Sequence, residues 1–208
     1  MVDWFRSRTW SKEIEAHFEA KLARSRDKSQ YLNIQGYELL AGEPVIAARL
    51  LERCAEIDDH WRADALHYLG QARMRLGDID GALGALDAAV EQEERVTWAR
   101  TGARTDRALI VAFYGVRERF DDLLPYLTAA NVDHELAMAE ELAAEAMILA
   151  EIGDRHRAGL VAREAFRWLA GLTDGKADHL ERGIGPEKGI SPAALNGRLG
   201  KIVAEMAH

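Results

Sequence analysis

HYLGQARMRLGDIDGALGALDAAVEQEE, residues 67–94, is the stretch that decides the fold. It holds two apolar patterns of helical period, separated by Gly77 and Asp78. Gly77 permits the left-handed backbone conformation that ends a helix, and Asp78 suits the N-cap of the next one. Small residues at Gly70 and Ala82 allow two antiparallel helices to approach closely, with leucines filling the space between them. The stretch therefore predicts a helical hairpin.

Three other segments follow the same plan. The pattern recurs in LAAEAMILAEIGDRHRAGLVAREAF, residues 142–166, where Gly153 and Asp154 form the turn. An earlier unit turns at Gly42 and Glu43, and Pro44 suits the first turn of its second helix. A weaker unit fills the gap between the two clear ones. We expect four hairpins, at roughly 31–57, 62–93, 103–129 and 134–170.

Single helices are expected at both ends of this array. The first spans about 11–27, with Ser11 as N-cap and an apolar stripe that would cover the first hairpin. Residues 171–190 hold five glycines and one proline, which indicates either an ordered loop or a mobile linker. A last helix then starts at Ser191 and runs over 191–206. Its apolar stripe predicts a helix that caps the last hairpin or, alternatively, a detachable helix that occupies the protein's own groove.

Over residues 31–170 the chain resembles the tetratricopeptide-repeat (TPR-like) superfamily, with degenerate repeats. The resemblance implies an all-α, right-handed α-solenoid of about four TPR-like hairpins with N- and C-terminal capping helices, forming a single domain over 1–208. The opening, Trp4-Phe5 followed by KLARSRDKSQYLNIQ (21–35), is similar to that of uncharacterised bacterial TPR-like proteins. In the second hairpin, Arg73 stands at a position where a TPR repeat usually has an aromatic residue. The resemblance therefore implies stacked hairpins but not a regular superhelix.

The resemblance also implies a binding groove, because the first helix of each TPR-like hairpin lines the concave surface. The groove positions fall on Gln30, Asn33 and Tyr37 in the first hairpin, Asp64, His67, Gln71 and Arg75 in the second, Arg104, Arg107 and Tyr114 in the third, and Glu140 and Met147 in the fourth. Polar residues mixed with Tyr and Met suit peptide recognition, and the alternative is an ordinary solvated face.

Composition narrows the function classes. At 48% hydrophobic and 30% charged the chain is not globally disordered. Its net charge of −8 argues against non-specific nucleic-acid binding, which needs a basic surface. The balance is uneven: residues 1–30 carry seven basic and five acidic side chains, or +2, which leaves −10 for the rest. We interpret the basic segment as a solvated helix face or, alternatively, as a docking patch.

The sequence offers little for catalysis or metal binding. His60, Asp64 and His67 share one helical face, yet no HExxH motif accompanies them. The glycine-rich GIGPEKGIS at 183–191 lacks the spacing of a phosphate-binding loop. Cys54, the one cysteine, sits among apolar residues and is expected to be a packed thiol. We therefore expect no catalytic residues, no metal and no cofactor.

No apolar run approaches the roughly 18 residues of a membrane span, and the N-terminus lacks the pattern of a secretory signal. We expect a cytoplasmic protein without a membrane partner. Trp4 and Phe5 are expected either to fold back on the first helix or to insert into a partner.

The functional prediction is a non-enzymatic module that binds a protein or peptide of unknown identity in the groove. The alternative is a regulatory or sensor subunit that binds a small molecule or signalling peptide and uses the C-terminal helix as a movable element. An enzyme with a pocket closed by 171–190 is a remote third. The sequence predicts no oligomeric state.

Overall fold

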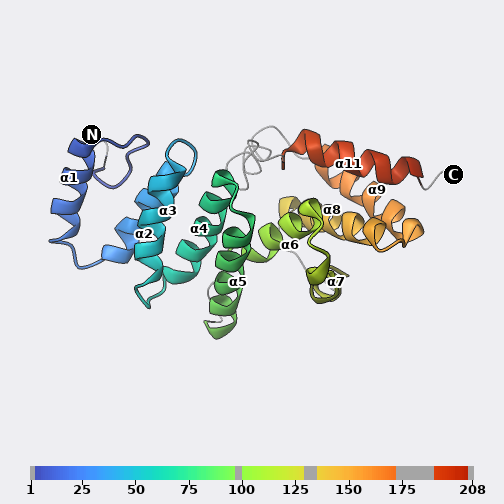
Figure 1. Cartoon of the computed structure of the whole chain (residues 1–208), viewed down its shortest axis with the longest axis horizontal. Helices are drawn as coiled ribbons and strands as arrows, with labels where there is room; N and C mark the ends of the chain where they lie inside the picture. Colours follow the sequence, from blue (N-terminus) through green and yellow to red (C-terminus); the bar gives the residue numbers. More distant parts are fainter. Residues whose placement is uncertain (1–2, 97–99, 129–134, 172–189, 206–208) are drawn as a thin grey trace. The chain divides into compact units, whose positions relative to one another are not determined.

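The computed structural model describes residues 3–96, 100–128, 135–171 and 190–205. In these ranges the chain forms ten α-helices and one short 3₁₀ helix, with no strand, so the predicted all-α class is confirmed (Figure 1). In chain order the elements are α1 (Lys12–Leu22), α2 (Lys28–Leu39), α3 (Pro44–Ala55), α4 (Arg62–Leu76), α5 (Ile79–Arg95), α6 (Ala103–Tyr114), η1 (Arg117–Arg119), α7 (Phe120–Thr128), α8 (Glu135–Glu151), α9 (Arg155–Gly171) and α11 (Pro192–Glu205).

Two compact units make up the chain, residues 1–104 and residues 105–208. In the first unit neighbouring helices pack in sequence: α2 on α3, α3 on α4, and α4 on α5 (Figure 1). The helix α2 also contacts α4, so the first helices of two successive hairpins lie next to each other. This contact brings side chains from positions about 30 residues apart in the chain onto one face.

Two glycines allow the helices of the first unit to approach closely. A Cβ atom built on Gly70 would lie 2.7 Å from Cγ of Leu86, and one on Gly36 would lie 2.6 Å from Cγ of Leu51. Both leucines are fully buried. Gly36 and Gly70 stand 34 residues apart, so α2–α3 and α4–α5 repeat the same packing contact.

The hairpin turns have the geometry that their residues predict. Gly77 ends α4 with a φ of 79°, and Asp78 then caps α5 by accepting a hydrogen bond from the backbone N–H of Gly81. Gly153 has a φ of 90°, and Asp154 accepts in the same way from the N–H of Arg157. These local interactions stop one helix and start the next within two or three residues.

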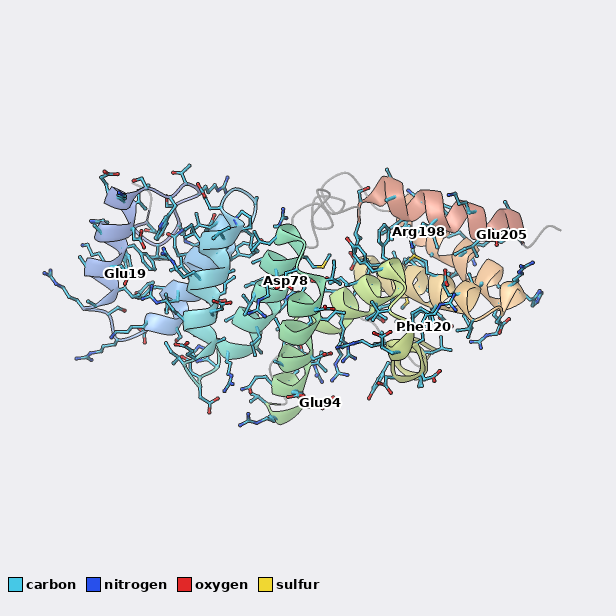
Figure 2. The ribbon with its side chains drawn as sticks, viewed as in Figure 1. Glu19, Asp78, Glu94, Phe120, Arg198 and Glu205 are labelled. Carbon is cyan, nitrogen blue, oxygen red and sulfur yellow. The ribbon has the colours of Figure 1, made fainter. Side chains whose placement is uncertain are left out.

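The first helix covers the open side of the first hairpin. Ser11 caps α1 as predicted, by accepting from the N–H of Ile14. Two ion pairs join α1 to α3, namely Glu15 to Arg49 at 2.6 Å and Glu19 to Arg53 at 2.5 Å (Figure 2, where Glu19 is labelled). The helix ends at Leu22 rather than near residue 27, because the chain turns there before α2 begins.

In the second unit α8 and α9 form a hairpin, and α11 packs on both of them, mainly on α9 (Figure 1). Ser191 caps α11 by accepting from the N–H of Ala194. The guanidinium of Arg198, labelled in Figure 2, lies 4.0 Å from the ring centroid of Phe113. The glycine-rich connection at 172–189 and Met206, the last residue of the predicted stripe, lie outside the described residues. None of the helices described here is long and apolar enough to cross a membrane.

Candidate functional site

The contact between α2 and α4 brings together Tyr37 from α2 and Tyr68 from α4, and we call the surface around these two rings the α2–α4 face. Asn33 and Asp64 each lie one turn earlier on the same two helices. The rings of Tyr37 and Tyr68 pack with their centroids 4.9 Å apart. Tyr37 is 43% exposed, while Tyr68 is half-buried beside it. An exposed aromatic ring held in place by a second ring is a typical anchor for a binding partner.

Asn33 adds an unsatisfied acceptor to this face. The residue is only 3% exposed, and its Oδ1 atom has no hydrogen-bond partner in the part of the chain that the structure describes. A buried carbonyl oxygen without a donor carries a desolvation cost of about 1–3 kcal/mol.

Burial shapes the electrostatics of the same face. Burial raises the pKa of the Asp64 carboxyl, while His67 acts in the opposite direction. Burial also raises the pKa of Tyr68 to about 12, with the nearby Asp64 and Tyr37 adding to the effect. The Tyr68 hydroxyl therefore stays protonated at neutral pH, and the partly buried Asp64 lies one turn before it on α4.

The remaining groove positions predicted on α4 point into the protein. His67, Gln71 and Arg75 are each at most 6% exposed. The Nε2 atoms of Gln71 and His67 lie 3.1 Å apart in a buried hydrogen bond. These side chains therefore offer little surface to a partner. Gln30, on the first turn of α2, is partly exposed.

Arg104 belongs to a polar cluster at the end of α5. Its Nε atom lies 3.5 Å from a carboxylate oxygen of Glu93, and it also pairs with Glu94 at 3.1 Å. Glu93 is 2% exposed and accepts hydrogen bonds from both the backbone N–H and the hydroxyl of Thr101. This network ties Thr101 and Arg104 to the end of α5.

The other predicted groove residues belong to the second unit. Arg107 is partly exposed and Tyr114 is 38% exposed, whereas Glu140 and Met147 on α8 are buried. Burial raises the pKa of the Glu140 carboxyl well above its ordinary range, and the neighbouring Asp106 and Glu141 raise it further. Glu140 is thus a buried carboxyl whose protonated form the folded protein favours, rather than an exposed acid.

The residues considered for chemistry are not assembled into a site. Within the described ranges no group of three or more His, Cys, Asp or Glu side chains is placed to hold a metal ion. His60 is exposed with its ring against Trp61, at a centroid distance of 5.0 Å. Cys54 is fully buried, and burial raises the pKa of its thiol to about 12. Most of the 183–191 segment lies outside the described residues.

One hollow in the first unit was not predicted from the sequence. It has a volume of about 600 Å³ and lies between the N-terminal segment and α1. Its lining includes Asp3 and Trp4 from that segment, and Glu13, Ile14, His17 and Lys21 from α1. The spacing of four between Glu13, His17 and Lys21 is the signal that places them on one helix face. Tyr68 was also not predicted as a site residue, although it lies four residues after the predicted Asp64 and therefore on the same face of its helix.

No family model matches this chain, and no curated protein or solved structure matches it either.

Proposed function

We propose that this chain is a non-enzymatic binding module, a right-handed α-solenoid of TPR-like hairpins that holds a segment of a partner protein or peptide on the α2–α4 face. Support for the repeat comes from the sequential packing of α2 to α5 and from the 34-residue spacing between the close contacts at Gly36 and Gly70. That spacing equals the period of tetratricopeptide repeats. The partner would lie across the first helices of successive hairpins.

The observation that carries the proposal is the exposed Tyr37 ring packed against Tyr68. Tyrosine supplies a large contact area at a small cost in side-chain entropy, and the second ring fixes its orientation before binding. Asp64, partly exposed one turn before Tyr68, adds a carboxylate acceptor near the pair. The surface therefore complements a segment that offers hydrogen-bond donors, such as backbone N–H groups or a basic side chain, together with an apolar group.

A peptide-display selection on the full chain tests the proposal directly. Peptides that are recovered would be synthesised, and their affinities measured by fluorescence polarisation for the wild type, Tyr37→Ala and Tyr126→Ala. Tyr126 is a matched control, because it is a tyrosine on α7 that is 59% exposed. We expect Tyr37→Ala to weaken binding by about tenfold, the loss typical of an interface anchor, and Tyr126→Ala to leave it unchanged.

Two outcomes would contradict the proposal. One is a selection that yields no peptide with saturable binding. The other is a set of peptides whose affinity is the same for the wild type and Tyr37→Ala. Thermal melts of both variants establish that a loss of affinity does not come from unfolding, since the ring of Tyr37 is only partly buried.

A further inference from the structure

The hollow beside α1 has two walls that the rest of the first unit holds in place. The N-terminal wall is fixed to α2 through Gln35, whose side-chain amide pairs with the backbone of Ser7. The Ser7 N–H donates to Oε1 at 3.1 Å, and Nε2 donates to the Ser7 carbonyl at 2.7 Å. The α1 wall is fixed to α3 by the ion pairs of Glu15 and Glu19. The cavity is therefore preformed, and its volume lies within the range of about 300–1,000 Å³ typical of small-molecule sites.

Aromatic packing makes the apolar side of the hollow rigid. The Trp4 ring lies 5.4 Å from the ring of Phe18 and 4.8 Å from that of Tyr31, measured between centroids. Phe18 is fully buried, so Trp4 rests on the core of the first unit. Trp4 still contributes to the cavity lining, together with Ile14. This side offers an indole and an aliphatic group to an apolar ligand.

The polar side chains of the lining differ in whether the protein already engages them. Asp3 lies 3.6 Å from the guanidinium of Arg6, and the Glu13 carboxylate accepts a 2.7 Å hydrogen bond from the Ser11 hydroxyl. The side chains of Lys21 and His17 form no hydrogen bond or ion pair with any described residue. Asp3 thus shares its charge with Arg6, and Glu13 stays an anion hydrogen-bonded to Ser11. The two basic side chains keep their donors for a ligand. The segment around them is also the basic part of the chain, with a net charge of +2 over residues 1–30.

We propose that this hollow binds a small organic anion with an aromatic body, an aromatic carboxylate, whose charged group is held by Lys21 and His17 and whose ring lies against Trp4 and Ile14. An ammonium donor paired with a carboxylate forms a charge-assisted hydrogen bond, about twice as strong as a neutral one. The apolar wall adds affinity by burying the ring, and the fixed walls keep the ordering cost of binding low. This site is separate from the α2–α4 face and does not depend on peptide binding there.

Isothermal titration calorimetry of the full chain with 1-naphthoate tests the site. The neutral 1-naphthamide has the same shape without the charge, and inorganic phosphate has charge without a ring. We expect saturable binding of one 1-naphthoate per chain, and at least about tenfold weaker binding of each of the two other probes. Lys21→Gln should weaken 1-naphthoate by about tenfold, because it removes the charge and keeps most of the stem. Lys28→Gln, the same change at an exposed position on α2, should leave the affinity unchanged.

Equal affinity for 1-naphthoate and 1-naphthamide, or equal affinity of the wild type and Lys21→Gln, would overturn the proposal. The absence of saturable 1-naphthoate binding would overturn it as well. Lys21 is exposed, and circular dichroism melts check that its variant is folded. Tyr37→Ala should bind 1-naphthoate like the wild type, so failure of this site and failure of the peptide-binding face give different results.

Discussion

Glu140 shows how a single side chain departs from its expected role. The sequence placed it on a groove as an exposed acid, but only 5% of it is exposed, and no described residue forms an ion pair with it. Water stabilises a carboxylate far better than a protein interior does, so burial raises the pKa of Glu140, and Asp106 and Glu141 raise it further. The folded protein thus favours the protonated acid.

This raised pKa predicts a pH-dependent stability. In the unfolded chain Glu140 ionises freely near its ordinary pKa, whereas in the folded chain ionisation is costly. Its contribution is therefore fully present below the ordinary pKa and is lost as the pH rises through the raised value. We expect Glu140→Gln to increase the free energy of unfolding, relative to wild type, by about 1 kcal/mol or more on going from pH 4 to pH 8. Urea denaturation at several pH values measures this difference.

The control for that experiment is Glu151→Gln on the same helix. Glu151 is exposed and pairs with Arg117, so its replacement should show no such increase with pH. A Glu140→Gln variant that loses stability against the wild type between pH 4 and pH 8 would mean that the ionised carboxylate has a stabilising partner.

At the scale of elements, the fold depends on how closely paired helices approach. In α4 and α5 a side chain at position 70 would meet Leu86 and the carbonyl oxygen of Ala82. In α2 and α3 the same contact joins Gly36 and Leu51. A helix interior normally favours alanine over glycine by about 1 kcal/mol, so glycine at these positions indicates that space, rather than helix propensity, decides the residue.

Two glycine-to-alanine changes separate these effects. Gly70→Ala would place a Cβ atom 2.7 Å from Cγ of Leu86 and 3.3 Å from a backbone oxygen, so one of the helices must shift. We expect overpacking of about 1–3 kcal/mol to exceed the gain in helix propensity, and the variant to be less stable than wild type.

Gly84→Ala is the matched control for this change. Gly84 lies on the exposed side of α5, and a Cβ atom there would meet nothing within 4 Å. We expect this variant to be more stable than wild type by up to about 1 kcal/mol. Chemical denaturation measures the free energy of unfolding of both variants. If Gly70→Ala is as stable as Gly84→Ala, the two helices are not in close contact at Gly70.

At the scale of the whole molecule, the chain divides into two compact units, each with its own packed helices. In the second unit α11 covers α9 and α8, and Gly200 lies against the ring of Phe166, with a Cβ built there 3.9 Å from Cζ. A lone helix of 14 residues is only marginally stable in water. The contact between α11 and α9 therefore stabilises both helices. The packing is that of a helix capping the last hairpin.

A chain ending at Gly171 tests this role of α11. We expect amide hydrogen exchange in α8 and α9 to become faster, because their apolar faces lose a covering helix, while exchange in α2 to α5 stays unchanged. Exchange measured by mass spectrometry gives both results in one experiment. Faster exchange at 62–76 and 103–117, with 134–170 unchanged, would instead indicate that the C-terminal helix covers the groove.

Much of the fold was predictable because its signals are local. Gly77 followed by Asp78 ends one helix and caps the next whatever lies elsewhere in the chain, and the same holds for Gly153 followed by Asp154. Ser11 and Ser191 mark helix starts for the same reason. The candidate site was predictable only in part: Tyr37 is exposed as a groove residue should be, whereas its neighbour Tyr68 was missed.

The sequence by itself determined the helical class, the turns and the order of the helices, since helix periodicity and capping depend on residues within a few positions of one another. Only the tertiary structure decided which polar side chains are buried and where a cavity lies. His67, Gln71 and Glu140 have the same helical spacing as exposed residues, yet each is at most 6% exposed in the folded protein. The hollow lined by Trp4 and Lys21 likewise exists because Gln35, 28 positions after Ser7, holds the N-terminal segment against α2.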